Sequence, residues 1–235
     1  MPLTPQLEAV IAARGYLCSA HRGAPSFGID NTDVAIRAAL EYAPDLIEVD
    51  VHRTVDNELI LWHDDHVDQA GQRLTIVQTA LEQLQAVRLK DGSRLVTLDE
   101  ALTISAGKAG LLIDLKAPNL EMLILESLTR CNAQNAVVCG GYTSTLRAVQ
   151  AAGIPASYTP DPLRELFKPA PLTWDALTVH HRTVTPALLA RANAEGVRVI
   201  AWTVDDPKRM LELIKIGIHG ITTNRIEILT ALEAR

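Results

Sequence analysis

The sequence predicts a (β/α)8-type barrel of the TIM class, with an extra N-terminal helix and a β-hairpin at residues 46–63. Short apolar runs alternate with helix-like segments along the chain, as they do in parallel α/β sheets. Most of these runs are continuously apolar, which is typical of strands that are buried on both faces. The length of 235 residues is close to the roughly 250 that such a barrel uses. A doubly wound open sheet is the structural alternative.

Start and stop signals define the expected helices. Thr4-Pro5, Thr185-Pro186 and Asp206-Pro207 each place an N-capping side chain before a proline at the first helical position. A glycine follows each pair at the same distance and is expected to end the helix. Thr97 and Glu100 form a capping-box signature. Besides the N-terminal helix, the expected helices are 33–43, 98–106, 119–131, 143–152, 186–195, 206–216 and 225–234.

Nine apolar runs are candidate strands, one more than the barrel needs. Two of them, 46–54 and 59–63, lie too close together for a crossover helix, so we expect an antiparallel hairpin. Asp56 and Asn57 tolerate positive φ and are the expected centre of a two-residue turn. The remaining eight strands would close the barrel. The nine runs are 17–20, 46–51, 59–63, 111–115, 136–139, 155–158, 176–179, 197–203 and 218–222.

The register of this hairpin decides which side chains share a face of the sheet. A two-residue turn pairs Thr54 with Leu59 and Asp50 with His63. By the two-residue period of a strand, Glu48, Asp50 and His63 would then share one face.

Composition limits the domain organisation and the class of partner. No low-complexity linker interrupts the chain, so residues 1–235 are expected to form one barrel domain, with a short insertion at about 65–97. The net charge of −6 argues against binding to nucleic acid, which needs a basic face. Three scattered cysteines, the lack of a visible signal peptide and the lack of an apolar run of about 18 residues favour a cytoplasmic location without stable membrane insertion. A homo-oligomer remains open.

Glu48 and Asp50 stand on one face of a buried-type strand, Leu46–Val51. Two buried like charges are unfavourable unless a cation or a proton compensates them. Mg²⁺ or Ca²⁺ is the natural partner of such oxygen ligands. A solvated sheet edge is the other interpretation.

Two histidines follow strand ends, where α/β barrels bind their ligands. His21 ends the first strand and precedes Arg22, whose guanidinium suits a phosphate group. His63 ends the second hairpin strand and precedes Asp64, as general acid/base chemistry would require. Taken alone, the His21-Arg22-Gly23 tripeptide would be better explained as a surface turn.

Two further strands carry candidate residues. Asp114 and Lys116 point to the same side of the strand 111–115; they could complete a metal site and neutralise a phosphate, or they could form an internal ion pair. Trp202 lies near the carboxyl end of the strand 197–203, where it could form a ligand wall or pack in the core.

Taken in order, these motifs resemble the glycerophosphodiester phosphodiesterase family. The resemblance spans residues 17 to 228, nearly the whole chain. The matching elements are His21-Arg22-Gly23, Asp30-Asn31-Thr32, Glu48-x-Asp50, Leu61-Trp62-His63-Asp64, Asp114-x-Lys116, Trp202-Thr203-Val204 and Gly220-Ile221-Thr222-Thr223-Asn224.

The resemblance implies a divalent metal at the mouth of a modified (β/α)8 barrel, either Mg²⁺ or Ca²⁺, with Mn²⁺ as a further candidate. It also implies a role for each matched residue. Glu48, Asp50 and Asp114 match metal ligands; His21 and His63 match the general acid/base pair; Arg22, Lys116 and Asn31 match groups that bind the phosphate; Trp202 matches an aromatic side chain of the substrate groove.

The chain departs from the family pattern at several positions. Asp30 replaces a usual glutamate, and Asn224 replaces a usual aspartate. Asp114 also replaces a glutamate, which shortens the reach of that ligand by one methylene. The segment 65–97 lacks the Arg-Thr-Thr-x-Gly stretch that usually follows the second histidine motif.

The expected reaction is metal-dependent hydrolysis of a small glycerophosphodiester to an alcohol and glycerol 3-phosphate, with the histidines as acid and base. Which histidine plays which part is left open. The alternatives are a lyase that stops at a cyclic phosphate, a catalytically weak protein that binds phosphate esters, and an unrelated barrel enzyme that acts on sugar phosphates. The Asp114 and Asn224 replacements are the best support for the weak binder.

Overall fold

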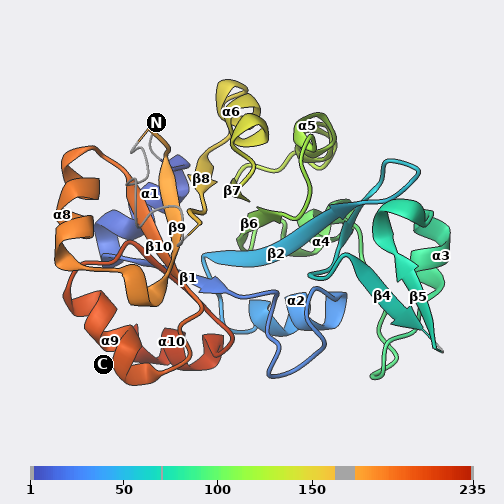
Figure 1. The fold of residues 1–235 in the computed structure, drawn as a ribbon. Helices are drawn as coiled ribbons and strands as arrows, with labels where there is room; N and C mark the ends of the chain where they lie inside the picture. Colours follow the sequence, from blue (N-terminus) through green and yellow to red (C-terminus); the bar gives the residue numbers. More distant parts are fainter. Residues whose placement is uncertain (1–2, 70, 162–172, 234–235) are drawn as a thin grey trace.

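Eight parallel strands close into a barrel in the computed structural model, which describes residues 3–69, 71–161 and 173–233. The strand order is β1-β11-β10-β9-β8-β7-β6-β2, and pairing of β1 with β2 closes the ring (Figure 1). The barrel strands are β1 (Leu17–Ala20), β2 (Leu46–Arg53), β6 (Gly110–Leu115), β7 (Ala136–Gly140), β8 (Ala156–Tyr158), β9 (Ala176–His180), β10 (Arg198–Trp202) and β11 (Gly220–Thr223). The predicted barrel is confirmed, and the open sheet is excluded.

Helices surround the barrel, and their boundaries follow the predicted capping signals (Figure 1). The side chains of Thr4, Thr185 and Asp206 accept hydrogen bonds from the first turns of their helices, and Thr97 and Glu100 form the capping box. None of the helices in the described part of the chain has the length and apolar character of a membrane span. The helices are α1 (Pro5–Arg14), α2 (Asp33–Leu40), α4 (Leu98–Ser105), α5 (Glu121–Arg130), α6 (Thr143–Ala151), α8 (Pro186–Ala194), α9 (Pro207–Lys215) and α10 (Ile226–Glu233).

The hairpin between β2 and β3 (Leu59–Leu61) is confirmed, but the predicted register is wrong by one residue. Arg53, not Thr54, lies opposite Leu59. The loop has three residues because Thr54 pairs with Glu58: the Thr54 N–H donates to the Glu58 carbonyl, and the Thr54 hydroxyl accepts from the Glu58 N–H. Asn57 ends the loop with a φ of 63°, as in the common three-residue hairpin loop. The strand therefore ends at Leu61, and His63 lies beyond it.

The segment after the hairpin folds against β3 at one end of the molecule (Figure 1). It contains a small hairpin of β4 (His66–Gln69) and β5 (Gln72–Thr75), a 3-10 turn at Ile76–Gln78 and helix α3 (Leu81–Ala86). These elements lie within the insertion predicted at 65–97, for which no internal structure was predicted. Their own apolar cluster consists of Ile60, Val67, Ile76, Leu84, Val87 and Leu95.

Two apolar layers flank the barrel wall. One fills the space between the strands and the surrounding helices. The other fills the amino-terminal end of the barrel interior, where Leu3, Leu7 and Ile11 meet strand residues such as Leu46 and Leu112. Because interior positions follow a two-residue period, the next interior positions toward the carboxyl ends include polar residues such as Glu48 and Thr222. The fold thus places polar groups at one end of a barrel that is apolar at the other.

Candidate active site

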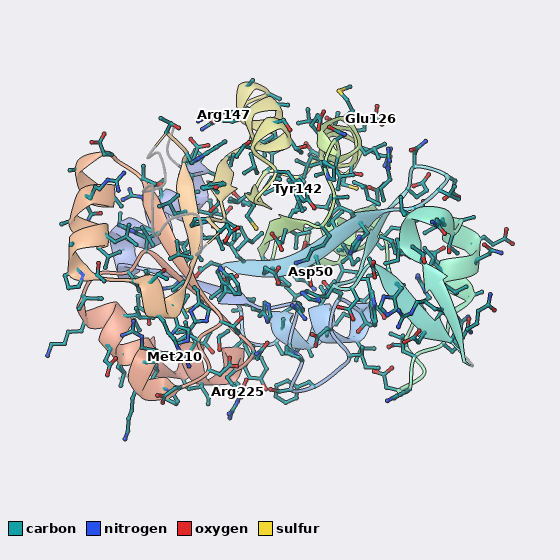
Figure 2. The ribbon with its side chains drawn as sticks, in the orientation of Figure 1. Asp50, Glu126, Tyr142, Arg147, Met210 and Arg225 are labelled. Carbon is teal, nitrogen blue, oxygen red and sulfur yellow. The ribbon has the colours of Figure 1, made fainter. Side chains whose placement is uncertain are left out.

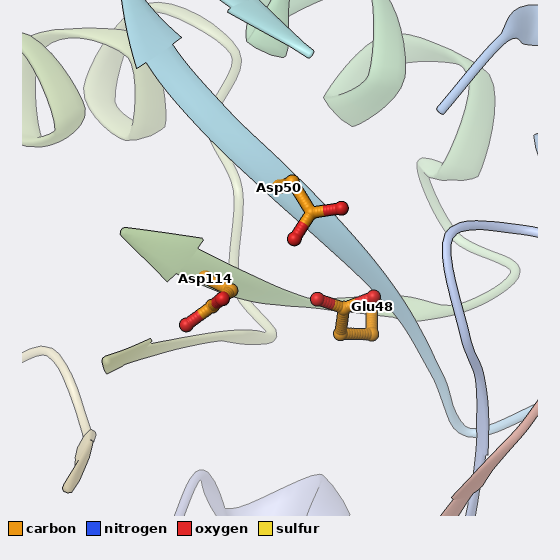
Figure 3. Close-up of side chains that lie close together, drawn as sticks. All are labelled: Glu48, Asp50 and Asp114. Carbon is orange, nitrogen blue, oxygen red and sulfur yellow. The ribbon is translucent and has the colours of Figure 1, made fainter. Parts of the chain in front are cut away.

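Three carboxylates meet at the carboxyl end of the barrel. Glu48 and Asp50 project from the same side of β2, and Asp114 lies directly opposite Asp50 on β6 (Figure 3). Asp50 is only 1% exposed and lies near the centre of the molecule, whereas Glu126 and Arg147 lie on its outer helices (Figure 2). One oxygen from each of the three carboxylates lies within 4.8 Å of the other two. The two-residue period of β2 and the parallel register with β6 create this cluster.

Two cations balance part of this charge. Lys116 places its Nζ 2.7 Å from Asp50 Oδ1 and 2.6 Å from Asp114 Oδ2, and Arg22 Nε lies 3.0 Å from Asp50 Oδ2. Burial opposes ionisation of Asp50, but Lys116 and Arg22 prevail and lower the pKa of that carboxyl below its ordinary value. Among the described residues, no lysine or arginine side chain lies at ion-pair distance from Glu48. Burial, together with the charges of Asp50 and Asp114, raises its pKa well above the ordinary value.

The cluster fits a divalent cation. Calcium–oxygen distances of about 2.4 Å would place opposite ligands about 4.8 Å apart, and magnesium would draw them slightly closer. The donors are all carboxylate oxygens, which hard cations prefer. A bound cation would favour the ionised form of Glu48, whose carboxyl is buried beside Asp50 and Asp114.

His21 follows β1 and is fixed by a chain of polar contacts. Its Nδ1 lies 2.7 Å from Asn224 Oδ1, and Asn224 Nδ2 in turn donates to Asp205 Oδ2 at 2.7 Å. Because a carboxylate can only accept, Asp205 fixes the orientation of the amide, and Asn224 Oδ1 must accept from His21. Nδ1 therefore carries a proton, and Nε2, 3.9 Å from Glu48 Oε2, faces the carboxylates. Burial lowers the pKa of His21.

His63 reaches the same site from the loop after β3. Its side chain is 46% exposed, and its Nδ1 lies 2.8 Å from Asp64 Oδ1. Its backbone carbonyl accepts a hydrogen bond from Nε2 of the buried His52 at 3.3 Å. His63 thus reaches the site although it lies outside the β2–β3 ladder.

The two remaining predicted residues, Trp202 and Asn31, differ in their position relative to the pocket. Trp202 borders the pocket and stacks edge-on against His180, with ring centroids 5.6 Å apart. Asn31 is fully buried and binds Asp50: its Nδ2 donates to Asp50 Oδ2 at 2.8 Å, and its Oδ1 accepts from the Asp50 N–H at 3.0 Å. Asn31 does not line the pocket, so contact with a phosphate stays a prediction for this residue.

One cavity of about 120 Å³ joins these groups. Eight of the nine predicted site residues line it, and the exception is Asn31. The lining residues are His21, Arg22, Glu48, Asp50, His63, Leu112, Asp114, Lys116, Cys139, Thr159, Thr178, Trp202 and Thr222.

Several residues of the site were not predicted. Asp205 follows β10 immediately after the Trp202-Thr203-Val204 motif, and its place beyond a strand end was an available signal. Cys139, whose Sγ lies 3.6 Å from Asp114 Oδ1, looks in the sequence like an ordinary buried strand residue. Thr159, Thr178 and Thr222 likewise carry no sequence signal beyond their positions near strand ends.

Comparison with known proteins identifies the family. The sequence model of the glycerophosphoryl diester phosphodiesterase family matches residues 21–138 and 164–228, well over half of the chain. The chain belongs to the glycerophosphoryl diester phosphodiesterase family. The predicted family and enzyme class are therefore confirmed: the chain is a phosphoric diester hydrolase of the glycerophosphodiester phosphodiesterase class.

Individual members of the family align over most of their length. A glycerophosphodiester phosphodiesterase from Caldanaerobacter subterraneus is 27% identical over 235 residues, which cover 92% of this chain and 97% of the relative. The structure of a glycerophosphodiester phosphodiesterase from Parabacteroides distasonis superposes with a TM-score of 0.80 at 23% identity, covering 94% and 98% of the two chains. A phosphodiesterase from Oleispira antarctica, solved with the product sn-glycerol-3-phosphate, superposes with a TM-score of 0.81 at 20% identity, covering 93% and 97%. At these identities the superpositions show the shared fold.

Proposed function

We propose that this member of the family hydrolyses a glycerophosphodiester to an alcohol and glycerol 3-phosphate, with a divalent cation and two histidines. The observation that carries the proposal is the meeting of His21, His63 and the three carboxylates around one cavity, although they lie far apart in the chain. The Oleispira protein of the same fold was solved with sn-glycerol-3-phosphate. That compound is the product proposed here.

Glu48, Asp50 and Asp114 would hold the cation. A bound divalent ion polarises a phosphoryl oxygen and stabilises the charge that develops on it. The side-chain amide of Asn31 donates a hydrogen bond to Asp50 Oδ2 and fixes that carboxylate. The backbone N–H of Arg22 donates to Glu48 Oε2 at 3.0 Å. These contacts hold two of the three ligands in position.

Arg22 and Lys116 would bind the phosphate. Both cations line the cavity and already contact Asp50, so each lies beside the position proposed for the metal. Preorganised cations of this kind stabilise the negative charge of a phosphoryl transition state.

The hydrogen bonds around the histidines support an assignment of their roles. His21 has its Nδ1 bound to Asn224, which leaves Nε2 as the basic atom on the side of the cavity. We assign His21 as the base that takes a proton from the attacking group, which is either water or a substrate hydroxyl beside the phosphate. The Nδ1 of His63 lies 2.8 Å from Asp64 Oδ1, a contact that orients the ring, so we assign His63 as the acid that protonates the leaving oxygen.

The proposed function is tested with a panel of glycerophosphodiesters, assayed for glycerol 3-phosphate with and without a chelator. We expect release of glycerol 3-phosphate that chelation abolishes and that Mg²⁺, Ca²⁺ or Mn²⁺ restores. His21→Ala and His63→Ala should each lower kcat by about 10²–10⁴-fold. Full activity of both variants, or activity that persists after chelation, would contradict the proposal. Phosphorus NMR that shows a cyclic phosphate as the final product would identify a lyase instead.

A further inference from the structure

His63 belongs to a loop rather than to a strand. The strand β3 ends at Leu61, and the side chain of His63 is 46% exposed. Its Nδ1 contacts Asp64, which is the next residue of the same loop. A loop side chain keeps a fixed position only where packed neighbours support the loop. The placement of His63 beside the carboxylates therefore depends on contacts between this loop and the rest of the molecule.

The side chain of His52 supplies such a contact. His52 Nε2 lies 3.3 Å from the backbone carbonyl oxygen of His63. Because a carbonyl oxygen can only accept a hydrogen bond, Nε2 must carry a proton and donate it. His52 is 8% exposed. A side chain that is buried among packed neighbours moves little, so His52 is a fixed donor for the backbone of a half-exposed residue.

His52 lies on the strand that also carries two of the three carboxylates. The outer end of β2 extends past β6 into the hairpin (Figure 1). Its pairing with β6 ends at Val51, and its pairing with β3 runs from Val51 to Arg53. By the two-residue period of a strand, His52 stands on the same face of β2 as Asp50. One rigid strand therefore holds both the carboxylates and the donor that binds His63.

Two further hydrogen bonds fix the course of the loop on either side of His63. The backbone N–H of Trp62 donates to the Asp50 carbonyl at 3.1 Å. The indole Nε1–H of Trp62 donates to the His66 carbonyl at 3.0 Å. These two bonds hold the neighbours of His63, whereas the bond from His52 holds the backbone of His63 itself.

We propose that His52 is a positioning residue for His63: its N–H holds the His63 backbone where the imidazole can transfer a proton beside the carboxylates. The proposal rests on the proposed function, in which His63 is the acid. His52 is not among the described residues that line the cavity, so it would act through His63 and not on the substrate. A shift of about 1 Å in a reacting group can lower the rate by about 100-fold.

Two substitutions of the same residue test the proposal. His52→Leu keeps an apolar side chain in the buried position but removes the donor, whereas His52→Gln keeps an N–H at a similar distance from the backbone. We expect His52→Leu to lower kcat on glycerophosphocholine by roughly 10–100-fold with little change in KM. His52→Gln should stay within about threefold of the unaltered protein. Full activity of His52→Leu, or equal losses in the two variants, would overturn the proposal.

A double-mutant cycle shows whether the effect passes through His63. In the His63→Ala background, His52→Leu should change kcat by less than about threefold, because the group that it positions is absent. A further loss of about 10-fold or more in the double variant would mean that His52 acts elsewhere, and the proposal would fail.

His219→Leu is the matched control. His219 is another buried histidine, and its Nδ1 accepts from the Val199 N–H. It precedes β11 and so lies at the amino-terminal end of the barrel, opposite the carboxylates. This variant should keep the kcat of the unaltered protein at temperatures at which it is folded.

Nuclear magnetic resonance of the His63 ring tests its placement without a substrate. The Cε1–H signal of His63 should shift or broaden in His52→Leu and stay unchanged in His52→Gln and His219→Leu. An unchanged signal in His52→Leu would overturn the proposal. If His52→Leu does not fold, His52→Asn takes its place, because this amide is one methylene shorter than that of His52→Gln and would leave the carbonyl unbound. If the unaltered protein hydrolyses no glycerophosphodiester with any divalent metal, the proposed function fails, and the signal of His63 still decides whether His52 positions it.

Discussion

Asp50 is the residue on which the arrangement of the site depends most. Its two oxygens contact Asn31, Arg22 and Lys116, and its backbone N–H binds Asn31 as well. A carboxylate that is 1% exposed tolerates its charge only with such compensation. Glu48, two residues earlier on the same strand, has no equivalent pair of cations in the described part of the chain. Asp50 is thus paired with two cations, whereas a bound cation or a proton would be needed to balance the charge of Glu48.

This difference predicts opposite effects of replacing Glu48 with and without metal. Burial, and then repulsion from Asp50 and Asp114, raise the pKa of Glu48. Glu48→Gln removes this unfavourable ionisation, so the metal-free variant should be at least as stable as the unaltered protein. A divalent ion at 100 times its Kd should raise the Tm of the unaltered protein by roughly 5–10 °C, but that of the variant much less. Thermal unfolding with and without Mn²⁺ measures both effects. An equal rise in Tm for both proteins would show that Glu48 does not bind the ion.

We expect the contact between Asn224 and His21 to fix the tautomer of the imidazole. Asn224→Ala removes the acceptor for Nδ1–H, so the imidazole should populate both tautomers. We expect kcat to fall by roughly 10–100-fold, as when outer partners of site histidines are removed, while KM changes little. Nitrogen NMR of the His21 ring reads the tautomer directly. Ser26→Ala is the control, because its hydroxyl donates to the backbone carbonyl of Asn224 and not to its side chain. A single Nδ1–H tautomer that persists in Asn224→Ala would contradict the assignment.

Some features of the site follow from the local sequence, whereas others depend on the closed barrel. The carboxylates were predictable because a two-residue spacing inside an apolar run places both side chains on one face. The partners of Asn224 were not, because the contact with His21 joins residues 203 positions apart and depends on how the barrel closes.

Among the elements, the hairpin shows a different limit. Its existence follows from two strands too close for a crossover, but its register depends on one backbone choice at Asn57. The bond between Thr54 and Glu58 lengthened the loop from two to three residues and moved His63 off the ladder. A turn with two central residues and one with three were both compatible with the sequence. The helices were easier to predict, because their capping residues act locally.

One contact between elements makes stability depend on pH. His219, which precedes β11, accepts a hydrogen bond from the Val199 N–H of β10 and contacts Asn193 of α8 at 2.8 Å. Burial, and then the nearby charge of Arg198, lower its pKa to about 4, while Glu8 opposes the shift. Its value in the unfolded chain is about 6.5. The unfolded state therefore binds the proton more tightly, and stability contributed by the neutral ring is complete above about pH 6.5 and is lost as pH falls toward 4.

We expect this histidine to cost the protein up to about 3 kcal/mol of unfolding free energy between pH 7 and pH 4. His219→Gln should lower stability at pH 7.5 but flatten its dependence on pH across this range. Urea unfolding of both proteins at several pH values measures the difference in unfolding free energy. The contributions of titratable groups that both proteins share cancel in this difference. Parallel curves for the two proteins would assign the acid sensitivity to other residues.

In the molecule as a whole, the apolar packing under α1 and the candidate active site lie at opposite ends of the barrel. Helix α1 covers the amino-terminal end with Leu7 and Ile11, together with Leu3, which precedes the helix. An ion pair between Glu8 and Arg198 joins the helix to the barrel wall. The ligand groups lie at the carboxyl ends of the strands. The alternation of strands and helices predicted the barrel and an additional first helix, but the position of that helix under the barrel required the closed sheet to be known.

This separation predicts that the covering helix can be weakened without loss of chemistry. Leu7 is 2% exposed, so Leu7→Ala should lower the free energy of unfolding by about 2–5 kcal/mol, while kcat and KM at temperatures well below the Tm stay unchanged. Leu211→Ala, which truncates a side chain that is 52% exposed on α9, is the matched control and should change stability by less than about 0.5 kcal/mol. Denaturant unfolding and steady-state kinetics on the same samples separate the two properties. A fall in kcat of Leu7→Ala at full folding would mean that the packing of the closed end reaches the carboxylates through Leu112, which lies in both the apolar cluster and the cavity wall.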